Sequence, residues 1–143
     1  MSKVSAAMDE FTRRVRAGGF ELQRCGECGQ FQWPPREICS ACWSDILEWT
    51  SADRTATIIA STVLHVSLER FFRERLPWRV GMVKLAAGPV AYAHLHEKSE
   101  EGSRVKIEVR IDYAGRAILI AAPEDAKLEK DKKLNELVSQ KEE

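Results

Sequence analysis

The chain has four cysteines, and they fall into two CxxC pairs that are separated by ten residues. The first pair is Cys25 and Cys28, and the second pair is Cys39 and Cys42. A CxxC turn places two thiolates on the same side of a tight turn, and two facing turns supply the four sulfur ligands that Zn²⁺ prefers. The spacing therefore predicts one closed, structural zinc site in a rubredoxin-like zinc ribbon.

Two other uses of the four sulfurs are compatible with this spacing. The thiols could form two disulfides, but the first ten residues carry no hydrophobic targeting run, which favours a reducing, cytoplasmic location. Iron would bind the same four sulfurs, and the protein would then be an electron carrier. Zinc is the preferred interpretation, and metal analysis with a visible spectrum distinguishes it from iron.

Size and charge limit the classes of partner. With 143 residues the chain has room for two small lobes. Its 22 basic and 22 acidic residues cancel, so no overall field attracts nucleic acid, and no apolar stretch reaches the roughly 20 residues that span a bilayer. We expect neither a nucleic-acid nor a membrane partner. A nucleic-acid-binding module is the alternative function, because zinc ribbons and OB barrels serve it in other proteins.

The two ends of the chain are predicted to be helical or charged. Residues 1–19 contain a helical pattern over 5–17, with Met8, Phe11 and Val15 on one face, and Gly18 ends the helix. This apolar face could pack on the chain's own core or on a partner. Residues 124–143 form a charged C-terminal helix or tail, whose short apolar stripe could dock on another subunit. The stripe consists of Leu134, Leu137 and Val138.

The segment between these ends divides into a zinc ribbon over residues 20–50 and a β domain over 51–123. Alternating apolar residues and turn signals predict about five strands in the second part. A closed antiparallel barrel of the OB type is the architecture that fits five strands in so small a core. The fold class is therefore mainly β. The predicted strands cover residues 54–63, 79–85, 90–96, 105–111 and 117–121.

Residues 65–78 form a long connection with an unusual number of aromatic side chains. A helical turn over 68–75 would place Leu68, Phe71 and Phe72 on one face. The segment either plugs the open end of the barrel or binds a ligand or partner. Both interpretations stay open from the sequence.

The sequence offers no obvious catalytic group. All four thiols are assigned to the metal, and a closed four-sulfur site has no position for an activated water. His94 and His96 share one face of a predicted strand with Tyr92, and we interpret them as polar residues on the solvent side of the barrel. Catalysis would then belong to a partner.

Five short motifs resemble a known family: residues 22–29, Pro34-Pro35-Arg36, residues 39–42, Leu76-Pro77-Trp78 and Gly88-Pro89. Over residues 11–123 the chain is similar to the zinc-ribbon plus OB-fold proteins catalogued as domain of unknown function 35. The resemblance implies a non-catalytic subunit of a thiolase-type enzyme, in a heterotetramer with two copies of each chain. It also implies acyl-CoA or CoA at the shared site. The partners of such proteins include the benzoylsuccinyl-CoA thiolase, which is the suggested specific partner.

A CoA-binding or partner-facing surface would need cations for the phosphates and an apolar channel. Arginine binds phosphate oxygens well because its guanidinium group is planar and forked. The arginines among the candidate residues could instead be solvated or form ion pairs with Glu69 and Glu74. The candidate residues are Arg36, Phe71, Phe72, Arg73, Arg75, Pro77 and Trp78.

Overall fold

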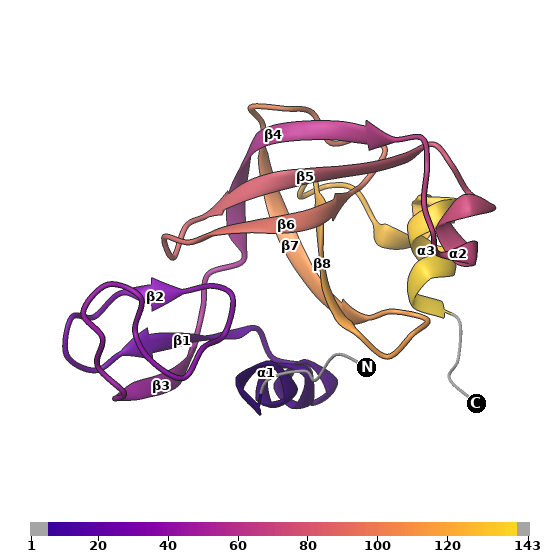
Figure 1. Ribbon diagram of the computed structural model, residues 1–143. Coiled ribbons are helices and arrows are strands. Elements are labelled where there is room, and N and C mark those ends of the chain that lie inside the picture. The colour runs from indigo at the N-terminus through magenta and orange to yellow at the C-terminus, as the bar shows by residue number, and fades with distance from the viewer. Residues whose placement is uncertain (1–5, 140–143) are drawn as a thin grey trace.

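The computed structural model describes residues 6–139 of the chain. It consists of an N-terminal helix, a three-stranded sheet, a closed five-stranded barrel and a C-terminal helix (Figure 1). The mainly β fold class expected from the sequence is confirmed. Within residues 6–139, no helix is both long and apolar enough to cross a membrane.

Helix α1, Ala6–Arg16, lies between the small sheet and the barrel (Figure 1). Its predicted first residue, Ser5, lies outside the described residues. The apolar face packs into the chain's own core: Phe11 is fully buried, and its ring meets the edge of Trp33 at 4.7 Å between centroids. The chain leaves the helix through Gly18, whose φ of 96° suits glycine. The apolar face of the helix therefore packs on the chain's own core, which was one of its two interpretations.

The ribbon sheet is built from β1 (Glu21–Cys25), β2 (Phe31–Gln32) and β3 (Leu47–Ser51). Strand β1 lies in the middle, and both of its neighbours pair with it in the antiparallel sense. Phe20 and Leu22 are buried in the same cluster as the barrel interior. The ribbon and the barrel thus share one hydrophobic core.

The barrel strands follow one another around the wall in the order β4-β5-β6-β8-β7. All neighbouring pairs are antiparallel except β6 and β8, which are parallel. The prediction of a fully antiparallel barrel is wrong at this pair, because an odd number of strands around a closed ring cannot alternate in direction everywhere. The strands are β4 (Thr55–Leu64), β5 (Trp78–Leu85), β6 (Val90–Leu95), β7 (Arg104–Ile111) and β8 (Ala117–Ala122).

The long connection between β4 and β5 covers one end of the barrel. It contains a single helical turn, α2 (Arg70–Arg73), which buries Phe71 against Trp78. The prediction that Leu68 shares this covered face is wrong, since Leu68 is 96% exposed. The helix begins only at Arg70, so Leu68 lies before the helical periodicity starts.

The C-terminal segment packs on this same end of the barrel. A short 3-10 turn, η1 (Leu128–Lys130), leads into α3 (Lys132–Ser139). Asp131 holds the start of α3 in place, because one of its carboxylate oxygens accepts from the amide of Leu134 at 3.2 Å and the other from the amide of Glu97 at 2.8 Å.

The apolar stripe of α3 is covered by the chain itself. Leu134 and Leu137 are 2% and 0% exposed and join Phe71, Trp78 and Ile120 in a second hydrophobic cluster. Val138 packs against this cluster. The hypothesis that the stripe docks on another subunit is therefore wrong for the described residues. Residues 140–143 of the predicted tail lie outside them.

Candidate metal centre

The four cysteines lie in two turns of similar construction. Cys25 ends β1, and the chain folds back so that the amide of Gly29 donates to the carbonyl of Cys25 at 2.9 Å. In the second turn the amide of Trp43 donates to the carbonyl of Cys39, also at 2.9 Å. Each turn therefore presents two sulfurs to the same side, as the CxxC spacing predicts.

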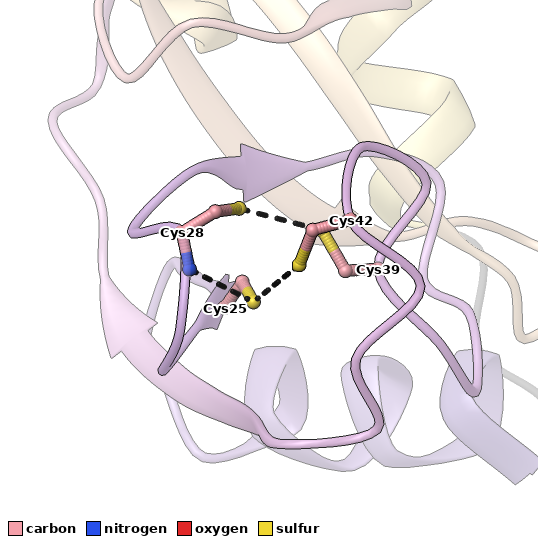
Figure 2. A group of neighbouring side chains, drawn as sticks. All are labelled: Cys25, Cys28, Cys39 and Cys42. Carbon is pink, nitrogen blue, oxygen red and sulfur yellow. Dashed lines mark hydrogen bonds between the residues drawn. The ribbon is translucent and has the colours of Figure 1, made fainter.

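The sulfur atoms are placed for tetrahedral coordination (Figure 2). All four Sγ atoms lie within 4.8 Å of one another, with 3.5 Å between Cys25 and Cys42 and 3.6 Å between Cys28 and Cys39. A Zn–S bond of about 2.3 Å in a regular tetrahedron gives sulfur–sulfur distances of about 3.8 Å. Disulfide sulfurs lie only about 2.05 Å apart. The geometry fits a shared ion and not two disulfides.

The electrostatics of the thiols also fit a bound cation. The amides of Cys28 and Glu27 donate to the Sγ of Cys25 at 3.4 Å, and these bonds, that of Cys28 most of all, lower the pKa of this thiol to about 6. A bond from the Ser44 amide lowers the pKa of Cys42, but the neighbouring thiols, that of Cys25 most of all, together with partial desolvation outweigh it and raise the pKa to about 12. Four thiolates this close need a compensating positive charge.

Two buried glutamines hold the second turn against the first, and the sequence analysis did not find them. The amide group of Gln32 donates to Gln23 at 2.9 Å, and Gln23 accepts from the Arg36 amide at 2.8 Å and donates to the Arg36 carbonyl at 2.7 Å. Gln32 accepts from the Ser40 amide at 3.0 Å. The sequence did offer a signal, because both glutamines occupy inward-facing positions on ribbon strands. A polar side chain at such a position is unusual unless it has a buried hydrogen-bond partner.

The predicted CoA-facing residues of the long connection are mostly used inside the fold. Phe71 and Trp78 are buried, Phe72 packs partly buried beside them, and the Pro77 carbonyl accepts from Lys133 at 2.7 Å. Arg75 forms an ion pair with Glu136 at 3.1 Å and lies over the Phe71 ring. The aromatic segment is thus a plug, which was one of its two interpretations.

Three candidates keep an exposed side chain, Arg36, Arg73 and Pro77, and the two cations among them lie in different parts of the molecule. Arg73 belongs to α2, whereas Arg36 belongs to the ribbon, and Figure 1 shows α2 at the side of the barrel that is remote from the ribbon. The structure therefore does not bring these two cations together in one surface. Their binding role stays a prediction for each one separately.

The interpretation of His94 and His96 as residues on the solvent side of the barrel is wrong for His96, which is buried, and only partly right for His94, which is half-buried. His96 is fully buried, with its ring nitrogens bonded to the Lys98 amide and the Lys127 carbonyl. His94 accepts a 2.9 Å hydrogen bond from the Trp78 indole at Nδ1. The strand alternation places Tyr92 outside, where it is 75% exposed, but α2 and the segment that follows β8 cover the later histidines.

Burial gives His94 a distinct titration. It lowers the pKa of His94 to about 4 from the ordinary 6.5, although Asp112 and Glu69 act in the opposite direction. Between pH 6.5 and pH 4 the unfolded chain binds a proton that the folded protein does not, so stability is full above this window and falls within it. The loss is at most about 3 kcal/mol, at 1.36 kcal/mol per pKa unit.

Urea unfolding at pH 7.5 and pH 5.0 checks this prediction. We expect the native protein to lose stability at pH 5.0, and His94→Asn to lose less, because an asparagine oxygen can accept from Trp78 without titrating. An equal loss of stability in both proteins would show that His94 is not the responsible group.

A four-cysteine ribbon joined to an OB-type barrel defines the class of zinc-ribbon OB-fold proteins. Within this class the chain belongs to the ChsH2 family. The ChsH2 rubredoxin-like zinc ribbon domain matches residues 14–48, and the ChsH2 C-terminal OB-fold domain matches residues 49–111. No curated protein matches the chain in sequence.

Two solved structures share the fold. A chain of the Ltp2-ChsH2(DUF35) aldolase is 20% identical with a TM-score of 0.72, over 86% of this chain and 98% of that one. A protein of unknown function from the DUF35 family of Sulfolobus solfataricus is 14% identical with a TM-score of 0.58, over 85% and 87%. The resemblance to this family is confirmed.

Proposed function

We propose that this chain is a zinc-binding, non-catalytic subunit of a thiolase-type acyl-CoA enzyme complex. The observation that carries the proposal is the gathering of all four cysteines of the sequence at one metal centre. A thiolase reaction needs a nucleophilic thiolate, so the reacting cysteine must come from a partner. Membership of the ChsH2 family and the likeness to a chain of the Ltp2-ChsH2 aldolase support a partner of this kind.

The metal in this proposal is one structural Zn²⁺ held by Cys25, Cys28, Cys39 and Cys42. When bound, it locks the two turns together and supplies no open coordination position. The amides that donate to the Cys25 and Cys39 sulfurs stabilise the thiolate form that the ion requires.

The partner in this proposal is a thiolase-like catalytic subunit in the cytoplasm, with two copies of each chain in the complex. Acyl-CoA or CoA binds at the shared site, where the chain supports assembly and substrate binding. Arg36 and Arg73 are candidate phosphate contacts, because both side chains are exposed and the Arg73 guanidinium donates only a long, 3.5 Å hydrogen bond to the Leu68 carbonyl. The specific complex in this proposal is the benzoylsuccinyl-CoA thiolase, with this chain as its small subunit, and it rests on the family resemblance alone.

Co-purification from the native host tests the assembly. We expect a thiolase-like protein to accompany the tagged chain in equal amounts, and only the complex to cleave or condense an acyl-CoA thioester. Thioester turnover by the purified chain alone would contradict the proposal. A salt-sensitive shift of a nucleic-acid probe would support the alternative function instead.

Calorimetry of the complex with acyl-CoA tests the two arginines. Because the two arginines lie in different parts of the molecule, we expect one of the variants, Arg36→Ala or Arg73→Ala, to weaken binding by about tenfold, since a hydrogen bond to a charged group contributes about 1.5 kcal/mol. Arg70→Ala is the matched control, because Arg70 is also exposed on α2 but lies in an ion pair with Glu74. Unchanged affinity in both variants would remove these arginines from the site.

A further inference from the structure

The two CxxC turns differ at one position. The residue after the last cysteine of each pair has a left-handed backbone, with φ of 79° at Gly29 and 68° at Trp43. Glycine adopts this conformation freely, whereas a Cβ atom is crowded there by the following carbonyl. Among the described residues, Trp43 is the one residue other than glycine with a positive φ. The second turn thus carries a tryptophan at a position that physically favours glycine.

The fold gains little from this side chain. Trp43 is 78% exposed, while Trp33, Trp49 and Trp78 all pack in or against the two hydrophobic clusters. No ring-stacking or cation–π contact within residues 6–139 involves the Trp43 ring. A strained backbone that holds an exposed aromatic side chain indicates a function outside the chain's own core.

Two further apolar side chains flank the same turn. Ile38 is 42% exposed and immediately precedes Cys39, and Ile46 is 49% exposed and contacts the first turn at Gly26. Three exposed apolar side chains thus occur within nine residues of the chain, and exposed aromatic and aliphatic side chains are typical of the core of a protein–protein interface. We call Ile38, Trp43 and Ile46 the knuckle patch.

The net negative charge of the zinc ribbon, residues 20–50, favours a cationic partner surface. Residues 20–50 contain two basic and five acidic residues, which gives 2 − 5 = −3, and four thiolates around a divalent ion add −4 + 2 = −2. A second copy that presented the same lobe would be repelled. A partner with cationic residues around an apolar pocket is attracted, because opposite potentials steer and orient association.

We propose that Trp43 is the anchor with which the metal lobe docks on its catalytic partner, in an apolar pocket that has a basic rim. This inference rests on the proposed function for the identity of the partner. Tryptophan is among the residues enriched at binding hot spots, which lie in well-packed, desolvated pockets. Its position beside the closed metal site gives the anchor a rigid base.

Trp43→Gly tests the anchor, because it removes the ring and relieves the backbone at once. We expect zinc content to be unchanged, the melting temperature to be equal or higher, and the dissociation constant of the complex to rise at least about 30-fold, the hot-spot threshold. Trp43→Phe, which keeps an aromatic ring, should retain most of the affinity. High salt should weaken the wild-type complex.

The possible outcomes separate the inferences. Wild-type affinity in Trp43→Gly overturns the anchor alone, and so does a loss of zinc or a lower melting temperature, because Trp43 would then be structural. Self-association of the wild type that Trp43→Gly abolishes would assign the patch to a second copy and overturn the anchor. Failure of the wild type to bind any thiolase-like subunit overturns the proposed function as well.

Discussion

Replacing Cys25 with serine is expected to unfold residues 20–50 and to abolish zinc binding. Serine supplies no thiolate, so the site loses one of four ligands. Structural zinc contributes an apparent free energy of about 10–16 kcal/mol in small zinc modules. The ribbon has little to replace it, because β2 is two residues long and pairs with β1 at only two positions.

Metal analysis and tryptophan fluorescence measure this effect. The variant should retain less than one zinc per chain, and the emission of Trp33 and Trp49 should shift to the red as their packing against Phe11 is lost. Ser40→Ala lies inside the second CxxC turn and is the matched control, since no hydrogen bond of the Ser40 hydroxyl is part of the site. Ser40→Ala should behave like the native protein.

The loss should extend beyond the ribbon. Phe20 and Leu22 are buried in the same cluster as Val83 and Leu95 of the barrel wall, so an unfolded ribbon exposes one end of the barrel. We expect a lower melting temperature for the barrel and no binding of the catalytic partner. A Cys25→Ser protein that kept its zinc, its ribbon and its partner would contradict the structural role of the metal.

Local patterns in the sequence predicted much of the fold because their physical causes are local. The CxxC spacing determines where two sulfurs lie, and the alternation of Val105 and Ile107 with Lys106 determines which face of β7 is buried. The helical spacing of Phe11 and Val15 likewise predicts an apolar face. These features depend on residues that are only a few positions apart.

Contacts between distant segments were not predictable in the same way. The sequence shows that α3 has an apolar stripe, but not that Trp78 and Ile120 lie ready to cover it. The same cluster contains Phe71, whose burial depends on distant segments, among them Tyr113 at 4.4 Å between ring centroids. His94 is half-buried because the distant ring of Phe72 stacks on it. These errors concern contacts between surfaces, whereas the error at Leu68 is local, because the helix begins two residues later than predicted.

Replacing Leu137 with aspartate should detach α3 from the barrel. Leu137 is 0% exposed and packs in the cluster that contains Phe71 and Trp78, so the carboxylate would be buried without a partner. Such a substitution costs about 4–5 kcal/mol or more, whereas the volume-conserving control Leu137→Met should cost less than about 1.5 kcal/mol. When α3 leaves the barrel, the aspartate is exposed to water. Local unfolding of α3 therefore requires less free energy than keeping the charge buried.

Limited proteolysis and hydrogen exchange distinguish this from a surface effect. In Leu137→Asp, cleavage after residue 123 should become rapid, and the amides of α3 and α2 should lose protection together, because the Arg75–Glu136 ion pair and the bond from Lys133 to Pro77 are lost with the helix. Binding of the catalytic partner through the ribbon should persist. Unchanged stability of the isolated chain with loss of the complex would instead mean that the stripe serves another subunit.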